Sequence, residues 1–90
     1  MIICDSSPLI ALAIIDCLSI LNNLKLEWCI PNAVFEEVTK KRKPYSEKLS
    51  QFVAGKVKKI KNYEAVADLM LVLDKGESEV IQLALEENAN

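Results

Sequence analysis

The chain has 90 residues, of which 51% are hydrophobic and 27% are charged, and its formal net charge is −2 at pH 7. This length allows one small domain with a modest core, and so small a net charge does not identify a partner. The chain contains no histidine and two glycines, which excludes Ser-His-Asp or Cys-His catalysis and a glycine-rich phosphate loop.

The three cysteines, Cys4, Cys17 and Cys29, lie in apolar stretches without CxxC spacing. This pattern predicts reduced core residues of a cytoplasmic protein rather than zinc ligands. The longest apolar stretch, Pro8 to Ile15, is much shorter than the roughly 20 residues of a membrane span. No basic segment precedes it, so we expect neither a membrane association nor a signal peptide.

A short buried strand followed by a helix is predicted at the start of the chain. Met1–Cys4 are apolar or favour β-structure, and Ser7-Pro8 is a typical helix start. The helix is expected from Pro8 to about Leu21, with one apolar stripe along it. Asp5 then lies between the carboxyl end of a strand and the amino end of a helix, where ligands bind in open parallel sheets.

The rest of the chain alternates between strand-like and helix-like patterns. The predicted elements are a strand over Leu26–Ile30, a helix over Ala33–Thr39, an exposed basic loop over Lys40–Pro44, a helix that begins near Ser46 and ends at Gly55, a weak strand over Lys56–Ile60, a helix over Tyr63–Leu73, and a last helix over Glu77–Glu87 that buries Val80, Ile81, Ala84 and Leu85. This alternation is typical of a parallel sheet with helices on both faces.

The alternation calls for another strand after the last helix, so we expect residues 1–90 to be the N-terminal portion of a longer domain. The first strand would otherwise have an open edge, which invites pairing. We therefore expect another chain, as in a homo-oligomer, or a rearranged element to cover that edge.

Charge is distributed unevenly along the chain. Nine of the eleven Lys and Arg residues fall between Lys40 and Lys61, and seven acids with one base, Lys75, fall between Asn62 and Asn90. A basic middle beside an acidic end suits contact with a polyanion on one side and with a metal on the other. Two solvated faces of a globular domain are the alternative.

Four acids stand near the ends of predicted elements: Asp5, Glu37, Glu77 and Glu79. Asp5 follows a buried strand, where an unpaired carboxylate is costly to desolvate. Glu37 could instead be a solvated acid on a helix surface with no function. Glu77 and Glu79 could be present only because acids in the first turn of a helix interact favourably with its dipole. With no histidine and no dedicated nucleophile, the remaining chemistry is a carboxylate cage for Mg²⁺ or Mn²⁺ that acts on a phosphodiester.

Three segments together resemble PIN-domain proteins, in particular the prokaryotic branch described as predicted nucleic-acid-binding proteins and related to VapC-type toxins. They are ICDSSPLIALA at 3–13, IPNAVFEEV at 30–38 and LDKGESEVIQLA at 73–84. The resemblance implies one domain over residues 1–90 with a three-layer α/β/α fold, of which this chain contains the first three strands and their helices. It also implies a metal-dependent endoribonuclease that uses Mg²⁺ or Mn²⁺.

The resemblance assigns roles by motif position. Asp5, Glu37 and Glu77 correspond to the family's catalytic and metal-binding acids, with Glu79 as a further ligand and Ser7 as a hydroxyl that orients metal or water. Family members continue with a fourth strand that carries one more Asp, which lies outside these residues.

Two classes of function remain open at this point. The first is a ribonuclease, the toxin of a toxin–antitoxin pair, with RNA and an antitoxin protein as partners. The second is a truncated, inactive remnant that binds RNA or protein, and a plain structural fragment is a third reading. In the first two of these readings, a set of basic residues would contact RNA phosphates without sequence-specific recognition: Lys40, Lys41, Arg42, Lys43, Lys58 and Lys59.

Overall fold

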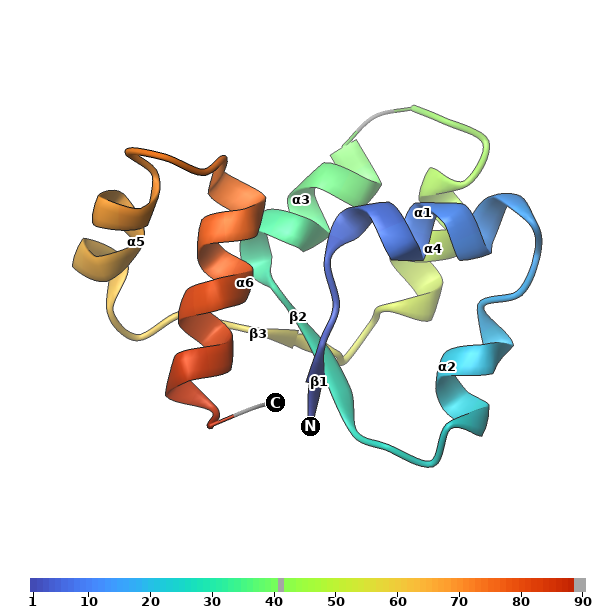
Figure 1. The fold of residues 1–90 in the computed structure, drawn as a ribbon. Helices are drawn as coiled ribbons and strands as arrows, with labels where there is room; N and C mark the ends of the chain where they lie inside the picture. Colours follow the sequence, from blue (N-terminus) through green and yellow to red (C-terminus); the bar gives the residue numbers. More distant parts are fainter. Residues whose placement is uncertain (41, 89–90) are drawn as a thin grey trace.

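The computed structural model describes residues 1–40 and 42–88. A three-stranded parallel sheet lies between two groups of helices (Figure 1), in the order β1 (Ile2–Ile3), β2 (Trp28–Pro31) and β3 (Val57–Lys58). Ile2 pairs with Trp28, and Ile30 pairs with Val57. The predicted α/β class and the parallel sheet are thus confirmed, and β2 lies at the centre.

The first helical region is two helices rather than one, so the predicted single helix from Pro8 to Leu21 was wrong. Helix α1 spans Ser6–Ile14 and helix α2 spans Ser19–Asn23. Between them Asp16 adopts a φ of 58°, and the amide of Cys17 donates to the carbonyl of Leu12 at 2.7 Å. This left-handed residue ends α1, because an α-helix cannot continue through a positive φ.

Two helices follow the central strand. Helix α3 (Asn32–Lys40) begins directly after β2, and helix α4 (Ser46–Phe52) packs against it. Lys40 therefore belongs to a helix and not to the predicted basic loop, while Arg42 and Lys43 lie outside any helix and are exposed. The direct passage from strand to helix places the start of α3 at the carboxyl end of the sheet.

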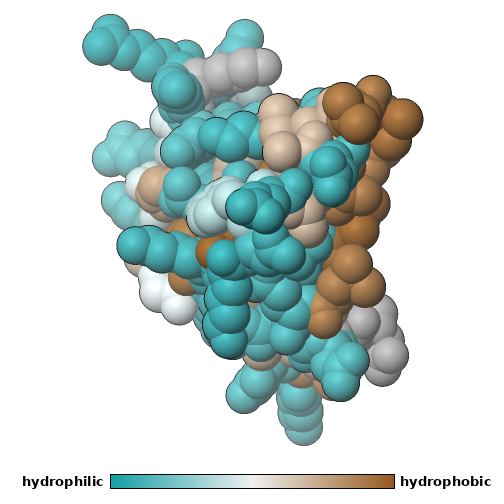
Figure 2. Space-filling model, turned by 90° about the vertical axis from the view of Figure 1, so that its left-hand side faces the viewer, coloured by the Kyte–Doolittle hydropathy of each residue, from teal (hydrophilic) through white to brown (hydrophobic). Residues whose placement is uncertain are grey.

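Helices α5 (Tyr63–Leu69) and α6 (Lys75–Glu86) complete the described chain. The predicted inward face of the last helix was wrong at Ile81, which is 39% exposed, and at Leu85, which is 69% exposed, whereas Val80 packs against an apolar core. Glu79 and Gln82 face inward instead, and each has a hydrogen-bond partner that compensates for its burial. Figure 2 shows apolar side chains gathered along one edge of this view, beside a mainly polar surface.

The sheet separates two apolar cores. Trp28 and Ile30 belong to the larger core with α1, α3 and α4, whereas Cys29 belongs to a smaller one with Leu83 of α6. The side chains of a strand alternate between its faces, which explains this division. Trp28 also stacks on Phe52, with ring centroids 5.4 Å apart. No helix in the described part of the chain has the length and apolar character needed to cross a membrane.

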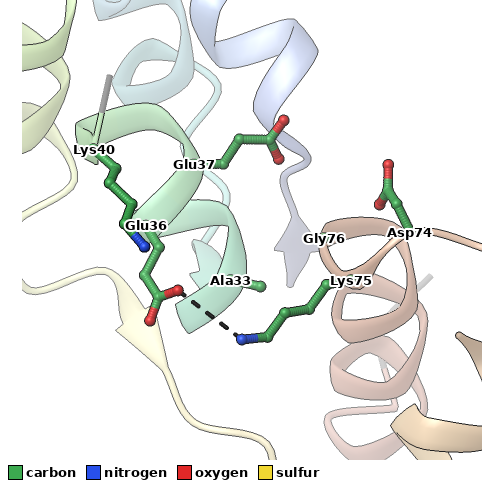
Figure 3. Close-up of a pocket in the computed structure, with 7 residues that line it drawn as sticks. All are labelled: Ala33, Glu36, Glu37, Lys40, Asp74, Lys75 and Gly76. Carbon is green, nitrogen blue, oxygen red and sulfur yellow. Dashed lines mark ion pairs between the residues drawn. The ribbon is translucent and has the colours of Figure 1, made fainter. Parts of the chain in front are cut away.

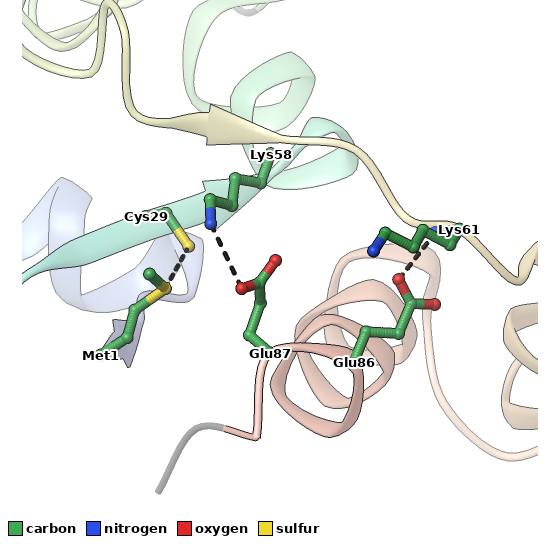
Figure 4. Close-up of polar contacts among 6 residues, drawn as sticks. All are labelled: Met1, Cys29, Lys58, Lys61, Glu86 and Glu87. Atoms are coloured by element: carbon green, nitrogen blue, oxygen red, sulfur yellow. Dashed lines mark hydrogen bonds and ion pairs between the residues drawn. The ribbon is translucent and has the colours of Figure 1, made fainter.

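Polar contacts attach the end of α6 to β3 and to the loop after it (Figure 4). Lys58 forms an ion pair with Glu87 at 3.2 Å, and the backbone amide of Lys61 donates to Oε1 of Glu86 at 2.7 Å. The amide of Asn62 donates to the other oxygen of Glu86 at 3.0 Å. These contacts hold the end of α6 beside β3, while its first turn lies next to α3, where Gly76 faces Glu37.

Candidate functional site

Asp5 and Glu37 lie on either side of one buried serine. Oδ1 of Asp5 accepts a hydrogen bond from the amide of Ser6 at 2.7 Å and thereby caps α1. The Ser6 hydroxyl donates to Oε2 of Glu37 on α3 at 3.0 Å. The sequence pointed to Ser7 as the hydroxyl near the first acid, but Ser7 is exposed and Ser6 makes this contact. Adjacent parallel strands β1 and β2 bring the two acids to one edge of the sheet.

The first turn of α6 completes this edge of the sheet. Oε2 of Glu37 lies so close to Gly76 that a Cβ at this position would be 3.1 Å from it. Oδ1 of Asp74 caps α6 by accepting from the amide of Glu77 at 2.8 Å. Asp74 was not predicted as a site residue, although an Asp shortly before a Glu-rich helical segment is a typical N-cap signal.

Glu77 is exposed at the start of α6, and its pKa is raised. The main cause is Asp74, whose side chain shares a hydrogen bond with the Glu77 carboxyl group and whose negative charge opposes its ionisation. Desolvation and the charges of Asp5 and Glu37 raise the pKa further. Three neighbouring acids therefore oppose the ionisation of Glu77 at this edge, and a nearby cation would favour its charged form.

The raised pKa of Glu77 predicts that the difference in stability between the wild type and Glu77→Gln depends on pH. The folded chain binds the Glu77 proton more tightly than the unfolded chain does, so this stabilisation is present at low pH and is lost as pH rises through the folded pKa. Glu77→Gln should therefore gain stability relative to the wild type between about pH 4 and pH 6. Thermal unfolding across this range measures the difference, and a difference independent of pH would contradict it.

Glu79 differs from the other acids in its burial and in its contacts. It is 2% exposed, and its Oε1 accepts a hydrogen bond from the amide of Ala33 at 3.0 Å. Ala33 is in the first turn of α3, where amides have no partner within the helix. Glu79 thus joins α6 to the start of α3, and this contact occupies one oxygen of the carboxylate that the sequence placed among the metal ligands.

The basic residues predicted to contact RNA have different surroundings. Lys40 lies on α3 beside the acids, Lys58 forms an ion pair with Glu87, and Lys59 is exposed directly after β3. Arg42 and Lys43 are exposed after α3. The remaining one, at position 41, lies outside the described residues.

A pocket of about 310 Å³ opens between α3 and the start of α6 (Figure 3). Its lining residues come from these two helices and from the cap of α6: Ala33, Glu36, Glu37, Lys40, Asp74, Lys75 and Gly76. Figure 3 shows the carboxylates of Glu37 and Asp74 on one side and the ion pair between Glu36 and Lys75, at 4.0 Å, on the other. The pocket therefore has an acidic side and a basic side.

The acidic side fits a hard cation by its chemistry, because carboxylate oxygens are the ligands that Mg²⁺ and Mn²⁺ prefer. Within residues 1–40 and 42–88, however, no three acidic, cysteine or histidine side chains lie close enough together to hold one ion. Mg²⁺ often needs only one or two carboxylates, with water and substrate phosphate as further ligands. The arrangement thus fits a cation held by Glu37 and Asp5 rather than a closed cage.

The whole chain matches a known protein family. A family model described as PIN domain matches residues 1–90, the whole chain. No curated protein matches the chain, and no solved structure matches it.

Proposed function

We propose, from the premise that the chain belongs to the PIN-domain family, that it contributes a metal-dependent ribonuclease site. The observation that carries this proposal is the connection of Asp5 to Glu37 through Ser6, at the carboxyl ends of adjacent parallel strands. Ligand sites of open α/β sheets lie at this edge. The raised pKa of Glu77 supports the proposal, because perturbed acids gather at functional sites.

In this proposal each residue has a distinct task. Asp5 and Glu37 would hold Mg²⁺ or Mn²⁺, and the ion would supply a water of lowered pKa and stabilise charge on the phosphodiester. Ser6 keeps the two carboxylates at a fixed separation. Glu77, with its raised pKa, can accept or release a proton closer to neutral pH than an ordinary Glu.

The partners proposed for the chain are RNA, an antitoxin protein and a second protein chain at the sheet edge. RNA would contact the exposed Arg42 and Lys43 after α3 and the exposed Lys59 after β3, and these residues would add affinity without recognising a particular sequence. A cytoplasmic toxin controlled by an antitoxin protein is the biological role we propose. Within the described residues β1 pairs only with β2, and its open edge is the place where a second copy or another chain would add to the sheet.

The second candidate is a module that binds RNA or protein without cleaving. The lack of three converging ligands among the described residues favours it. Incubating the purified chain with a mixed RNA pool in Mg²⁺, in Mn²⁺ or in a chelator separates the two candidates. Cleavage that requires the cation supports the nuclease, whereas RNA that is bound but intact in all three conditions supports the binding module.

Gly76 provides a test of the metal site that does not depend on catalysis. Gly76→Ala would place a Cβ 3.1 Å from Oε2 of Glu37, so the carboxylate must move. We expect Mn²⁺ affinity, measured by calorimetry, to fall several-fold, while the free energy of unfolding changes by less than about 1 kcal/mol.

The matched control is Gly55→Ala. Gly55 has a φ of 80°, and a Cβ added to it would meet no atom within 4 Å, so alanine should cost about 1 kcal/mol of stability and leave Mn²⁺ affinity unchanged. Equal Mn²⁺ affinity in the wild type and in Gly76→Ala would argue against Glu37 as a ligand.

A further inference from the structure

We propose that Lys40 and Lys75 form a phosphate subsite on the basic side of the pocket, so that the site takes a polynucleotide rather than a single nucleotide. This inference rests on the proposed function, because it assigns the neighbouring acidic side to the cation and the scissile phosphodiester. A strand crossing the pocket would then place an adjacent phosphate at the two lysines.

The sorting of charge within the pocket is the first argument. Lys40 and Glu36 come from α3, and Lys75 comes from the start of α6. Figure 3 shows the lysine side chains on the Glu36 side, away from the carboxylates of Glu37 and Asp74. Two positive charges against one negative charge leave the basic side net positive, and this favours an anionic group there.

The weakness of the existing ion pair is the second argument. Lys75 and Glu36 are 4.0 Å apart, with 56% and 45% of their side chains exposed, and exposed pairs of this kind contribute little to stability. Lys40 makes no ion pair within the described residues. Glu36 also accepts a hydrogen bond from Asn32 at 3.2 Å, so it can remain in place when Lys75 turns to a phosphate.

The position of Lys75 in the sequence is the third argument. It is the one base among the residues from Asn62 to Asn90, which carry seven acids. Its side chain lies in the pocket beside the acids, where a positive charge reduces the repulsion that an approaching phosphate meets. Because Glu36 pairs with Lys75, its carboxylate competes with a substrate phosphate for this lysine.

Fluorescence anisotropy with a labelled, single-stranded 12-nucleotide RNA tests the subsite. Ca²⁺ replaces Mg²⁺, so that binding is measured without cleavage. We expect Lys40→Gln and Lys75→Gln each to weaken binding about 3- to 10-fold near 50 mM salt. Each should also lower the slope of log affinity against log salt by about 0.7. Glu36→Gln should instead tighten binding, because it removes the competing charge.

Two exposed residues supply the controls. Lys25→Gln removes one positive charge near the opposite end of the sheet, and Glu64→Gln removes one negative charge on α5. Pocket variants that match these controls would overturn the subsite, as would a wild type that binds no RNA. Lysine-dependent binding without cation-dependent cleavage would instead overturn the nuclease and leave the subsite standing.

Discussion

Asp5→Asn is expected to lower any cation-dependent RNA cleavage by more than about 100-fold, because it removes the charge of a proposed metal ligand. The substitution should leave the fold intact. Oδ1 of Asp5 caps α1 by accepting from the Ser6 amide at 2.7 Å, and Asn is as good an N-cap as Asp. The change therefore separates the charge of Asp5 from its structural contact.

The measurement is the initial cleavage rate in Mn²⁺ together with thermal unfolding of both proteins. Asp16→Asn is the matched control, since the Asp16 side chain is 86% exposed, pairs with Lys48 at 2.8 Å, which lowers its pKa, and does not line the pocket. Cleavage that persists unchanged in Asp5→Asn would come from another site or a contaminant, and the proposal would fail.

Glu79→Ala should be the most destabilising single change at the interface of α3 and α6, with a loss of roughly 2–4 kcal/mol. It removes a side chain that is 2% exposed and leaves the buried amide of Ala33 without its acceptor at 3.0 Å. An unsatisfied buried donor and a new cavity both lower the free energy of unfolding. Urea denaturation of the wild type and the variant gives the difference.

Glu79→Gln distinguishes the structural contact from a ligand role. Gln keeps an oxygen at the position that accepts from Ala33, so most of the stability should return while the negative charge is absent. Unchanged Mn²⁺ affinity in this variant would restrict Glu79 to structure. Affinity reduced as strongly as in Asp5→Asn would instead make it a ligand, as the sequence suggested.

The sequence alone determined the class of fold and the neighbourhood of the site. Strand-like and helix-like segments alternate along the chain, and short connections between them allow little except parallel strands with helices between them. Asp5 follows one strand and α3 follows the next, so their proximity follows from the rule that parallel strands end at one edge. These inferences depend on local pattern and topology, which the sequence carries directly.

The tertiary structure decided which side chains meet. Periodicity placed Ile81 and Leu85 inside and passed over Ser6 and Gly76, whose importance comes from their contacts with Glu37 on α3. A polar side chain such as Glu79 faces inward only because the start of α3 offers it an unpaired amide, and that amide is 46 residues away in the chain. Hydrogen-bond complementarity across packed helices can override the hydrophobic pattern at such positions, because an unpaired buried donor costs about 1–3 kcal/mol, as much as exposing an isoleucine.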